Sequence, residues 1–185
     1  MGFQASKPFE YLHIDTTFVP TDQRGKLRVA FVKDNYSRSI LLGKVLPDAS
    51  STPIRDLLKE TFEKYGLIPP DEKIHVVSDR GSENKGDVNE YLARLGKQVI
   101  KLTAKQAEFP QSNSMVESTM HQFKNVFLKS RSTLDDRHLT QQIVAFMHWN
   151  DHLREKQKAS HYSETFCFYS SFHFALPIST PYTRQ

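Results

Sequence analysis

The first part of the chain alternates between short apolar runs and polar turns. Residues 11–19, 27–33 and 39–46 are rich in β-branched and aromatic side chains, which favour strands. Polar turns at residues 20–26 and 34–38 separate these runs. Strands joined by such short turns predict an antiparallel meander of three strands.

A change to helical spacing follows. Apolar side chains recur at intervals of three and four residues, which predicts a helix over residues 53–65. These side chains are Ile54, Leu57, Leu58 and Phe62. Gly66 provides a helix stop, and a short apolar run at residues 74–77 predicts a fourth strand. A strand–helix–strand unit favours parallel pairing with a right-handed crossover.

The remaining pattern predicts one more strand and three more helices. We expect a helix over 87–95, a strand over 98–102, a polar loop over 103–111, and helices over 113–130 and 139–152. Residues 161–185 have no clear period, and we expect no regular structure there. The order of elements predicts an α/β fold with a five-stranded mixed sheet flanked by helices.

Composition narrows the class of protein only slightly. A length of 185 residues fits one domain with a substantial core. A net charge of +4 permits a polyanionic partner without requiring one. The single cysteine, Cys167, excludes an internal disulfide and a cysteine-rich zinc site. We find no apolar run of roughly 18 residues and no secretory segment, so we expect no membrane partner.

Three acidic residues have contexts that suit a shared site. Asp15 lies inside the first strand, Asp79 follows the strand at 74–77, and Glu117 lies early in the helix at 113–130. Each alone has an ordinary explanation: an edge-strand acid, a turn-forming aspartate or a solvated helix residue. Together they provide the carboxylates that Mg²⁺ prefers, and two ions about 4 Å apart suit phosphodiester chemistry.

The spacing of these acids brings in a known family. There are 63 residues between Asp15 and Asp79, and 37 between Asp79 and Glu117. The segments HIDTTFV, VVSDRGSEN and PQSNSMVESTMHQFK surround the three acids, and DNYSR forms the turn at 34–38. Over about residues 11–150 the chain resembles the catalytic core of DDE transposases and retroviral-type integrases, and in particular bacterial insertion-sequence members.

The resemblance implies an RNase H-like fold and a DDE polynucleotidyl transferase. In that interpretation Asp15, Asp79 and Glu117 are catalytic and bind Mg²⁺ or Mn²⁺, with two ions in the site. The implied reaction is DNA strand cleavage followed by strand transfer in transposition or integration. The implied partners are element ends, target DNA and further copies of the chain in a homodimer or larger oligomer. The implied location is the bacterial cytoplasm, associated with the nucleoid.

Several side chains near the acids are candidates for DNA contacts. His121 and Lys124 follow Glu117 by four and seven residues, so they share its helix face. The other candidates are Arg80, Lys85, Gln111, Ser112 and Asn113. We predict no ligand role for His13. His148 and His152 are spaced for one zinc ion, but two ligands do not complete a site.

The predicted domains are an N-terminal extension or cloning remnant over 1–10, the catalytic core over 11–153 and a tail over 154–185. Two other functions stay open. One is an RNase H-like nuclease for RNA–DNA hybrids or branched DNA, whose usual fourth acid would be Glu83 or Asp87. The other is a non-catalytic DNA-binding or assembly module derived from a transposase.

Overall fold

The computed structural model describes residues 4–106 and 113–159. The chain forms two compact units, Met1–His152 and Leu153–Gln185. The first unit contains the sheet. The prediction of no regular structure over 161–185 lies outside the described residues, as do residues 107–111 of the predicted polar loop.

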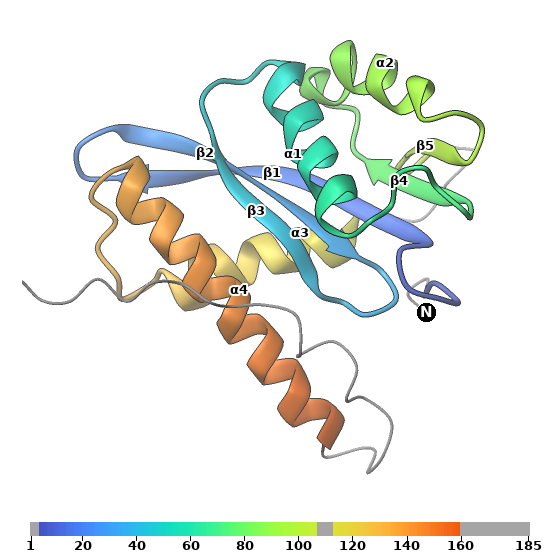
Figure 1. The fold of residues 1–185 in the computed structure, drawn as a ribbon. Helices are drawn as coiled ribbons and strands as arrows, with labels where there is room; N and C mark the ends of the chain where they lie inside the picture. The colour runs from blue at the N-terminus through green and yellow to red at the C-terminus, as the bar shows by residue number, and fades with distance from the viewer. Residues whose placement is uncertain (1–3, 107–112, 160–185) are drawn as a thin grey trace, which may run out of the picture. The chain divides into compact units, whose positions relative to one another are not determined.

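Five strands form one mixed sheet, as the sequence predicted (Figure 1). They are β1 (Tyr11–Thr21), β2 (Gly25–Asp34), β3 (Ile40–Leu46), β4 (Ile74–Ser78) and β5 (Val99–Thr103). Their order across the sheet is β3-β2-β1-β4-β5. The first three strands pair antiparallel, while β4 lies parallel to both β1 and β5. The C-terminal ends of β1, β4 and β5 therefore point the same way.

The helices differ from the predicted ones mainly at their ends. They are α1 (Ser51–Lys64), the 3-10 turn η1 (Ser82–Asn84), α2 (Asp87–Arg94), α3 (Ser114–Gln122), the π turn η2 (Phe123–Phe127) and α4 (Asp136–Ala159). The last helix begins three residues earlier than predicted, because Asp135 caps it by accepting from the His138 backbone N–H at 2.8 Å. None of the described helices is long and apolar enough to span a bilayer.

The single helix predicted over 113–130 is divided by its backbone bonding. After α3 the chain enters a π turn, in which the Leu128 N–H donates to the Phe123 carbonyl, five residues back, at 2.9 Å. This turn places Phe123 and Phe127 together, with ring centroids 6.3 Å apart, and both side chains are buried. An apolar stripe predicts the buried face but not this local change of pitch.

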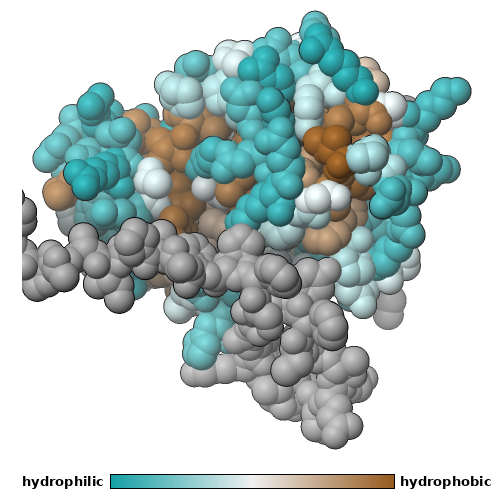
Figure 2. All heavy atoms as spheres, viewed as in Figure 1, coloured by the Kyte–Doolittle hydropathy of each residue, from teal (hydrophilic) through white to brown (hydrophobic). Residues whose placement is uncertain are grey.

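Each face of the sheet carries its own core. Alternate residues of β2 point to opposite faces, so Ala30 and Val32 pack with α1 and α2, while Val29 and Phe31 pack with α3, η2 and α4. Phe146 of α4 joins the second core, with its ring 5.7 Å from that of Phe31. Figure 2 shows hydrophilic side chains over much of the face viewed, with apolar groups visible between them.

Residues 5–10, part of the predicted N-terminal extension, pack against other residues of the first unit. Ala5 is buried, and its N–H donates to the Asn35 Oδ1 at 2.7 Å. The Phe9 N–H donates to the Asp34 Oδ1 at 3.0 Å, and its ring lies 5.6 Å from the ring of Tyr65. These contacts attach the segment to the turn after β2 and to α1.

Gly43 on β3 provides a test of the second core. A Cβ at this position would lie 2.5 Å from the Phe31 ring and 2.9 Å from Ile143. We expect Gly43→Ala to lower the free energy of unfolding by about 1–3 kcal/mol, because the core must move to admit the methyl group. Urea denaturation measures this change. The exposed Lys44→Ala on the same strand is the control, and equal stability of the two variants would contradict this packing.

Candidate active site

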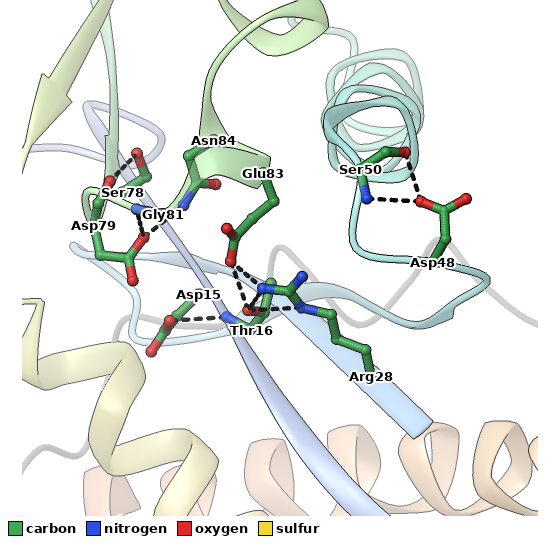
Figure 3. A network of polar contacts seen from close by, with 10 residues as sticks. All are labelled: Asp15, Thr16, Arg28, Asp48, Ser50, Ser78, Asp79, Gly81, Glu83 and Asn84. Carbon is green, nitrogen blue, oxygen red and sulfur yellow. Dashed lines mark hydrogen bonds and ion pairs between the residues drawn. The ribbon is translucent and has the colours of Figure 1, made fainter. Parts of the chain in front are cut away.

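Asp79 is held by the turn that follows β4. The strand ends at Ser78, and Asp79 is the next residue. Its Oδ1 accepts from the Gly81 N–H at 2.9 Å and from the Asn84 Nδ2 at 2.6 Å. Both bonds are made to the same oxygen, and they fix the orientation of the carboxyl group just beyond the end of β4 (Figure 3).

Lys101 of β5 supports this turn from the neighbouring strand. Its Nζ donates to the backbone carbonyl of Asn84 and, at 2.6 Å, to the Oδ1 of Asn89 on α2. Burial lowers the pKa of Lys101, with the Lys85 charge adding to the effect. Lys101 thus fixes Asn84, which in turn orients Asp79. The roles of Lys101 and Asn84 were not predicted from the sequence, because hydrophobic periodicity carries no information on hydrogen bonds between polar side chains.

Asp15 reaches the same end of the sheet as Asp79. His13 of β1 pairs with Val77 of β4 in parallel register, and each acid comes two residues later. The Asp15 Oδ1 accepts from the Thr16 N–H at 2.8 Å. Figure 3 shows the Asp15 side chain on β1 and the Asp79 side chain on the turn that follows β4.

The electrostatics of Asp15 show that other acids are near. Burial is the largest cause that raises its pKa, to about 6, and the charges of Asp79, Glu117 and Glu83 raise it further. The hydrogen bond from Thr16 opposes this shift. The negative charges of Asp79 and Glu117 therefore act on the Asp15 carboxyl and disfavour its charged form.

Glu117 enters from the other side of the site. It lies in the first turn of α3, and its N–H donates to the Asn113 carbonyl at 3.1 Å. Glu117 and Asp79 line one cavity of about 340 Å³, together with Arg80, Ala104, Lys105 and Asn113. The structure thus brings two of the predicted acids into one cavity and places the third within electrostatic reach of both.

The donor set suits a hard divalent cation. Carboxylate oxygens are the ligands that Mg²⁺ and Mn²⁺ prefer, and a cation would relieve the repulsion at Asp15. Within residues 4–106 and 113–153, however, no three His, Cys, Asp or Glu side chains are placed to hold one ion as they stand. Shared binding of a metal therefore requires these carboxyl groups to rotate toward one another.

Glu83 is an acid with its own cationic partner. It forms an ion pair with Arg28 and accepts from the Thr16 hydroxyl at 3.2 Å. The Arg28 guanidinium also donates to the Thr16 hydroxyl at 2.9 Å, and it lies over the Phe18 ring. Gly81 makes room for this carboxyl, since a Cβ there would lie 2.4 Å from the Glu83 Oε2. The Glu83 charge is thus compensated within the protein (Figure 3).

Asp87 is likewise engaged elsewhere. At the start of α2 it accepts from the Thr52 hydroxyl and lies 3.6 Å from the Arg55 guanidinium. Both residues belong to α1. Asp87 therefore connects α1 with α2.

The predicted DNA contacts have different surroundings. Lys124 lies in η2, and its Nζ donates to the Thr17 hydroxyl of β1 at 3.3 Å. His121 and Lys85 are exposed, and Arg80 is exposed at the cavity. Asn113 lines the cavity too, but its side chain is buried, and its amide bonds to His13 and to the Ile14 carbonyl. Gln111 and Ser112 lie outside the described residues.

Comparison with protein families gives one match relevant to this site. The family model described as integrase core domain matches residues 5–106, which include Asp15 and Asp79. A search of curated proteins finds no match.

Solved structures share the fold at low sequence identity. A chain of the simian T-cell lymphotropic virus intasome, solved with the PP2A regulatory subunit B56 gamma, is 15% identical with a TM-score of 0.61. The match covers all of this chain and 63% of that one. The BIV integrase catalytic core domain is 13% identical with a TM-score of 0.52, covering 83% of this chain and 99% of that one.

The catalytic domain of Mos1 mariner transposase is 12% identical, with a TM-score of 0.54. The match covers 84% of this chain and 85% of that one. The same domain has been solved with Raltegravir and either Mn or Mg. These likenesses confirm the RNase H-like fold that the sequence resemblance implied.

Proposed function

The chain belongs to the integrase core domain family, and from this we propose that it is a metal-dependent polynucleotidyl transferase that cuts DNA and transfers the freed strand to target DNA. The observation that carries the proposal is the cavity shared by Asp79 and Glu117, with Asp15 at the same end of the sheet. Three acids on two strands and a helix supply the carboxylates that this reaction needs.

In this proposal Asp15, Asp79 and Glu117 hold Mg²⁺ or Mn²⁺. The structures of the Mos1 catalytic domain with Mn and with Mg support that choice of cofactor. Two bound ions would activate water or a 3′-hydroxyl and stabilise the charge that develops on the phosphate. Gly81 and Asn84 keep the Asp79 carboxyl oriented through Oδ1 at the end of β4.

The fourth-acid candidates argue against the alternative nuclease. An RNase H-like nuclease would use Glu83 or Asp87, yet Glu83 is paired with Arg28 and Asp87 lies beside Arg55. Neither acid is placed as a free ligand beside the other three. We therefore prefer DNA strand cleavage and transfer over hydrolysis of RNA–DNA hybrids or branched DNA.

One assay separates these activities. The protein is incubated with Mn²⁺ and a supercoiled plasmid, an RNA–DNA hybrid or a four-way junction, and a labelled oligonucleotide with a free 3′-hydroxyl serves as donor. We expect plasmid nicking and joining of the oligonucleotide, both abolished by EDTA. Selective cleavage of the hybrid or the junction would support the nuclease instead. Mn²⁺-independent binding with no cleavage of any substrate would support an assembly module.

Lys124 is expected to contact a DNA phosphate. Its Nζ contacts Thr17, which follows Asp15 by two residues on β1. The ammonium group therefore lies on the side of β1 where α3 lies. We expect Lys124→Ala to weaken DNA binding several-fold and to reduce the slope of log K against log[salt] by about 1, because one phosphate contact is lost. Fluorescence anisotropy over a salt series measures both changes.

Lys97→Ala is the matched control for Lys124→Ala. Lys97 is exposed and precedes β5, so it lies at the opposite end of that strand from the acids. An unchanged salt slope in Lys124→Ala, or an equal fall in both variants, would remove Lys124 from the DNA surface.

We also propose that the protein acts as a homo-oligomer, which light scattering on the DNA complex would test.

A further inference from the structure

Asn113 connects the two elements that carry Asp15 and Glu117. Its Nδ2 donates to the Ile14 carbonyl of β1 at 3.0 Å, and its Oδ1 lies 2.7 Å from the His13 Nδ1. Ile14 is the residue directly before Asp15. Asn113 is 2% exposed, so these bonds are made away from solvent.

The backbone of Asn113 at the same time starts the glutamate helix. Its carbonyl accepts from the N–H groups of Val116 and Glu117, each at 3.1 Å. Its side chain makes no capping bond to α3, although asparagine is a preferred capping residue. The side chain is used instead to attach the first turn of α3 to β1.

His13 is held in one tautomer by a second asparagine. The Asn35 Nδ2 donates to the His13 Nε2 at 3.2 Å, so Nε2 is the acceptor and Nδ1 carries the hydrogen. The Nδ1–H therefore donates to the Asn113 Oδ1. The ring is 2% exposed.

A further contact holds α3 beyond Glu117. The Nζ of Lys33 on β2 donates to the Thr119 hydroxyl at 2.5 Å, and both side chains are buried. Glu117 thus lies between two points where α3 is bound to the sheet. The contact at Asn113 is the one that reaches the peptide next to Asp15.

We propose that Asn113 and His13 are positioning residues that set the separation of the Asp15 and Glu117 carboxyls, an inference that rests on the proposed metal-dependent function. Asn113 bonds to the peptide before Asp15 with its side chain and to the Glu117 N–H with its carbonyl. His13 fixes the orientation of that side chain amide. Loss of the contact lets α3 shift from β1, and a shift of about 1 Å at a catalytic group can cost about a hundredfold in rate.

Two substitutions of His13 separate its two ring nitrogens. His13→Asn places an amide nitrogen near the position of Nδ1 and keeps a donor for Asn113. His13→Gln places its amide near the position of Nε2, so it keeps the bond to Asn35 and loses the donor to Asn113. Asn113→Ala removes the contact entirely. Asn150→Ala is the control, because Asn150 is also a buried asparagine but lies on α4.

The readout is Mn²⁺ binding, measured by electron paramagnetic resonance titration without DNA and accompanied by thermal unfolding. We expect Asn113→Ala and His13→Gln to weaken Mn²⁺ binding about tenfold or more, as is usual when support of a metal ligand is lost. We expect a smaller loss in His13→Asn and none in Asn150→Ala. In the strand-transfer assay, kcat falls in the first two variants while KM for DNA changes little.

Three results would overturn the proposal in different ways. If the wild type binds Mn²⁺ and Asn113→Ala and His13→Gln bind it equally well, the positioning role is wrong and the proposed function stands. If the wild type binds no Mn²⁺ at millimolar concentration, both are wrong. An equal loss of Mn²⁺ binding in His13→Asn and His13→Gln would also contradict the positioning role. Such a loss would not depend on the Nδ1 donor and would reflect lower stability instead.

Discussion

Asp79→Asn and Glu117→Gln are each expected to lower Mn²⁺-dependent strand transfer by at least about a hundredfold, since each removes a charged ligand from the proposed metal site. Both substitutions preserve the size of the side chain. Asn at position 79 also keeps an Oδ1 to accept from Gly81 and Asn84, as Asp79 does. The measurement is the initial rate of joining a pre-cleaved oligonucleotide to plasmid DNA.

Two exposed acids give matched controls for this experiment. Asp71→Asn makes the same chemical change in the segment before β4, and Glu90→Gln makes it on α2. We expect both controls to transfer strands at nearly the wild-type rate. Wild-type activity in Asp79→Asn and Glu117→Gln would show that the cavity they line is not the site of the chemistry.

Asp15→Asn is expected to stabilise the metal-free protein at pH 8 and to abolish its stabilisation by Mn²⁺. The folded state raises the pKa of Asp15 from 3.8 to about 6. An acid with a raised pKa contributes stability below its unfolded pKa, and that contribution is lost as the pH rises through the folded pKa. At pH 8 the charged carboxyl therefore costs at most about 3 kcal/mol, reduced by partial solvent screening.

Asparagine removes this charge while its Oδ1 still accepts from Thr16. We expect Asp15→Asn to raise Tm by about 2–6 °C at pH 8 without metal, and by much less at pH 5, where Asp15 itself is mostly protonated. Mn²⁺ should raise the Tm of the wild type, because it binds only the folded state. The same ion should leave Asp15→Asn nearly unchanged.

Differential scanning calorimetry with and without Mn²⁺ at pH 5 and pH 8 measures all four conditions. Asp71→Asn is again the control, since Asp71 is exposed. A lower Tm for Asp15→Asn than for the wild type at pH 8 without metal would contradict the repulsion assigned to Asp15. An equal Mn²⁺ stabilisation in both proteins would exclude Asp15 as a ligand.

Much of the fold follows from local patterns. Successive side chains of a strand point to opposite faces of the sheet. In β2 this alternation separates Ala30 and Val32 from Val29 and Phe31, and the two pairs lie in the two cores. The strand–helix–strand order over residues 39–77 predicted a parallel pairing of the third strand with the fourth, whereas in the structure β4 pairs in parallel with β1. Since parallel strands end at one edge, that pairing already brings the ends of the strands carrying Asp15 and Asp79 together.

The supporting polar contacts could not be read in the same way. Asn113 and His13 are 100 positions apart, and Asn113 and Ile14 are 99 apart. No local period relates such residues, and asparagine in a polar loop is more often exposed than buried. The sequence therefore offered Asn113 as a DNA contact from the loop but did not predict that its side chain is buried against β1. The hydrogen bonds that link Lys101 to Asn84 and Asn84 to Asp79 were not predicted from the sequence for the same reason.

The most direct test of the shared metal site is a crystal structure of the protein soaked in Mn²⁺, with the ions located by anomalous scattering. We predict at least one Mn²⁺ bound by carboxylate oxygens of Asp15 and Asp79, with Glu117 turned toward the same ions. A crystal soaked in saturating Mn²⁺ that shows no anomalous peak between these three side chains would contradict this prediction.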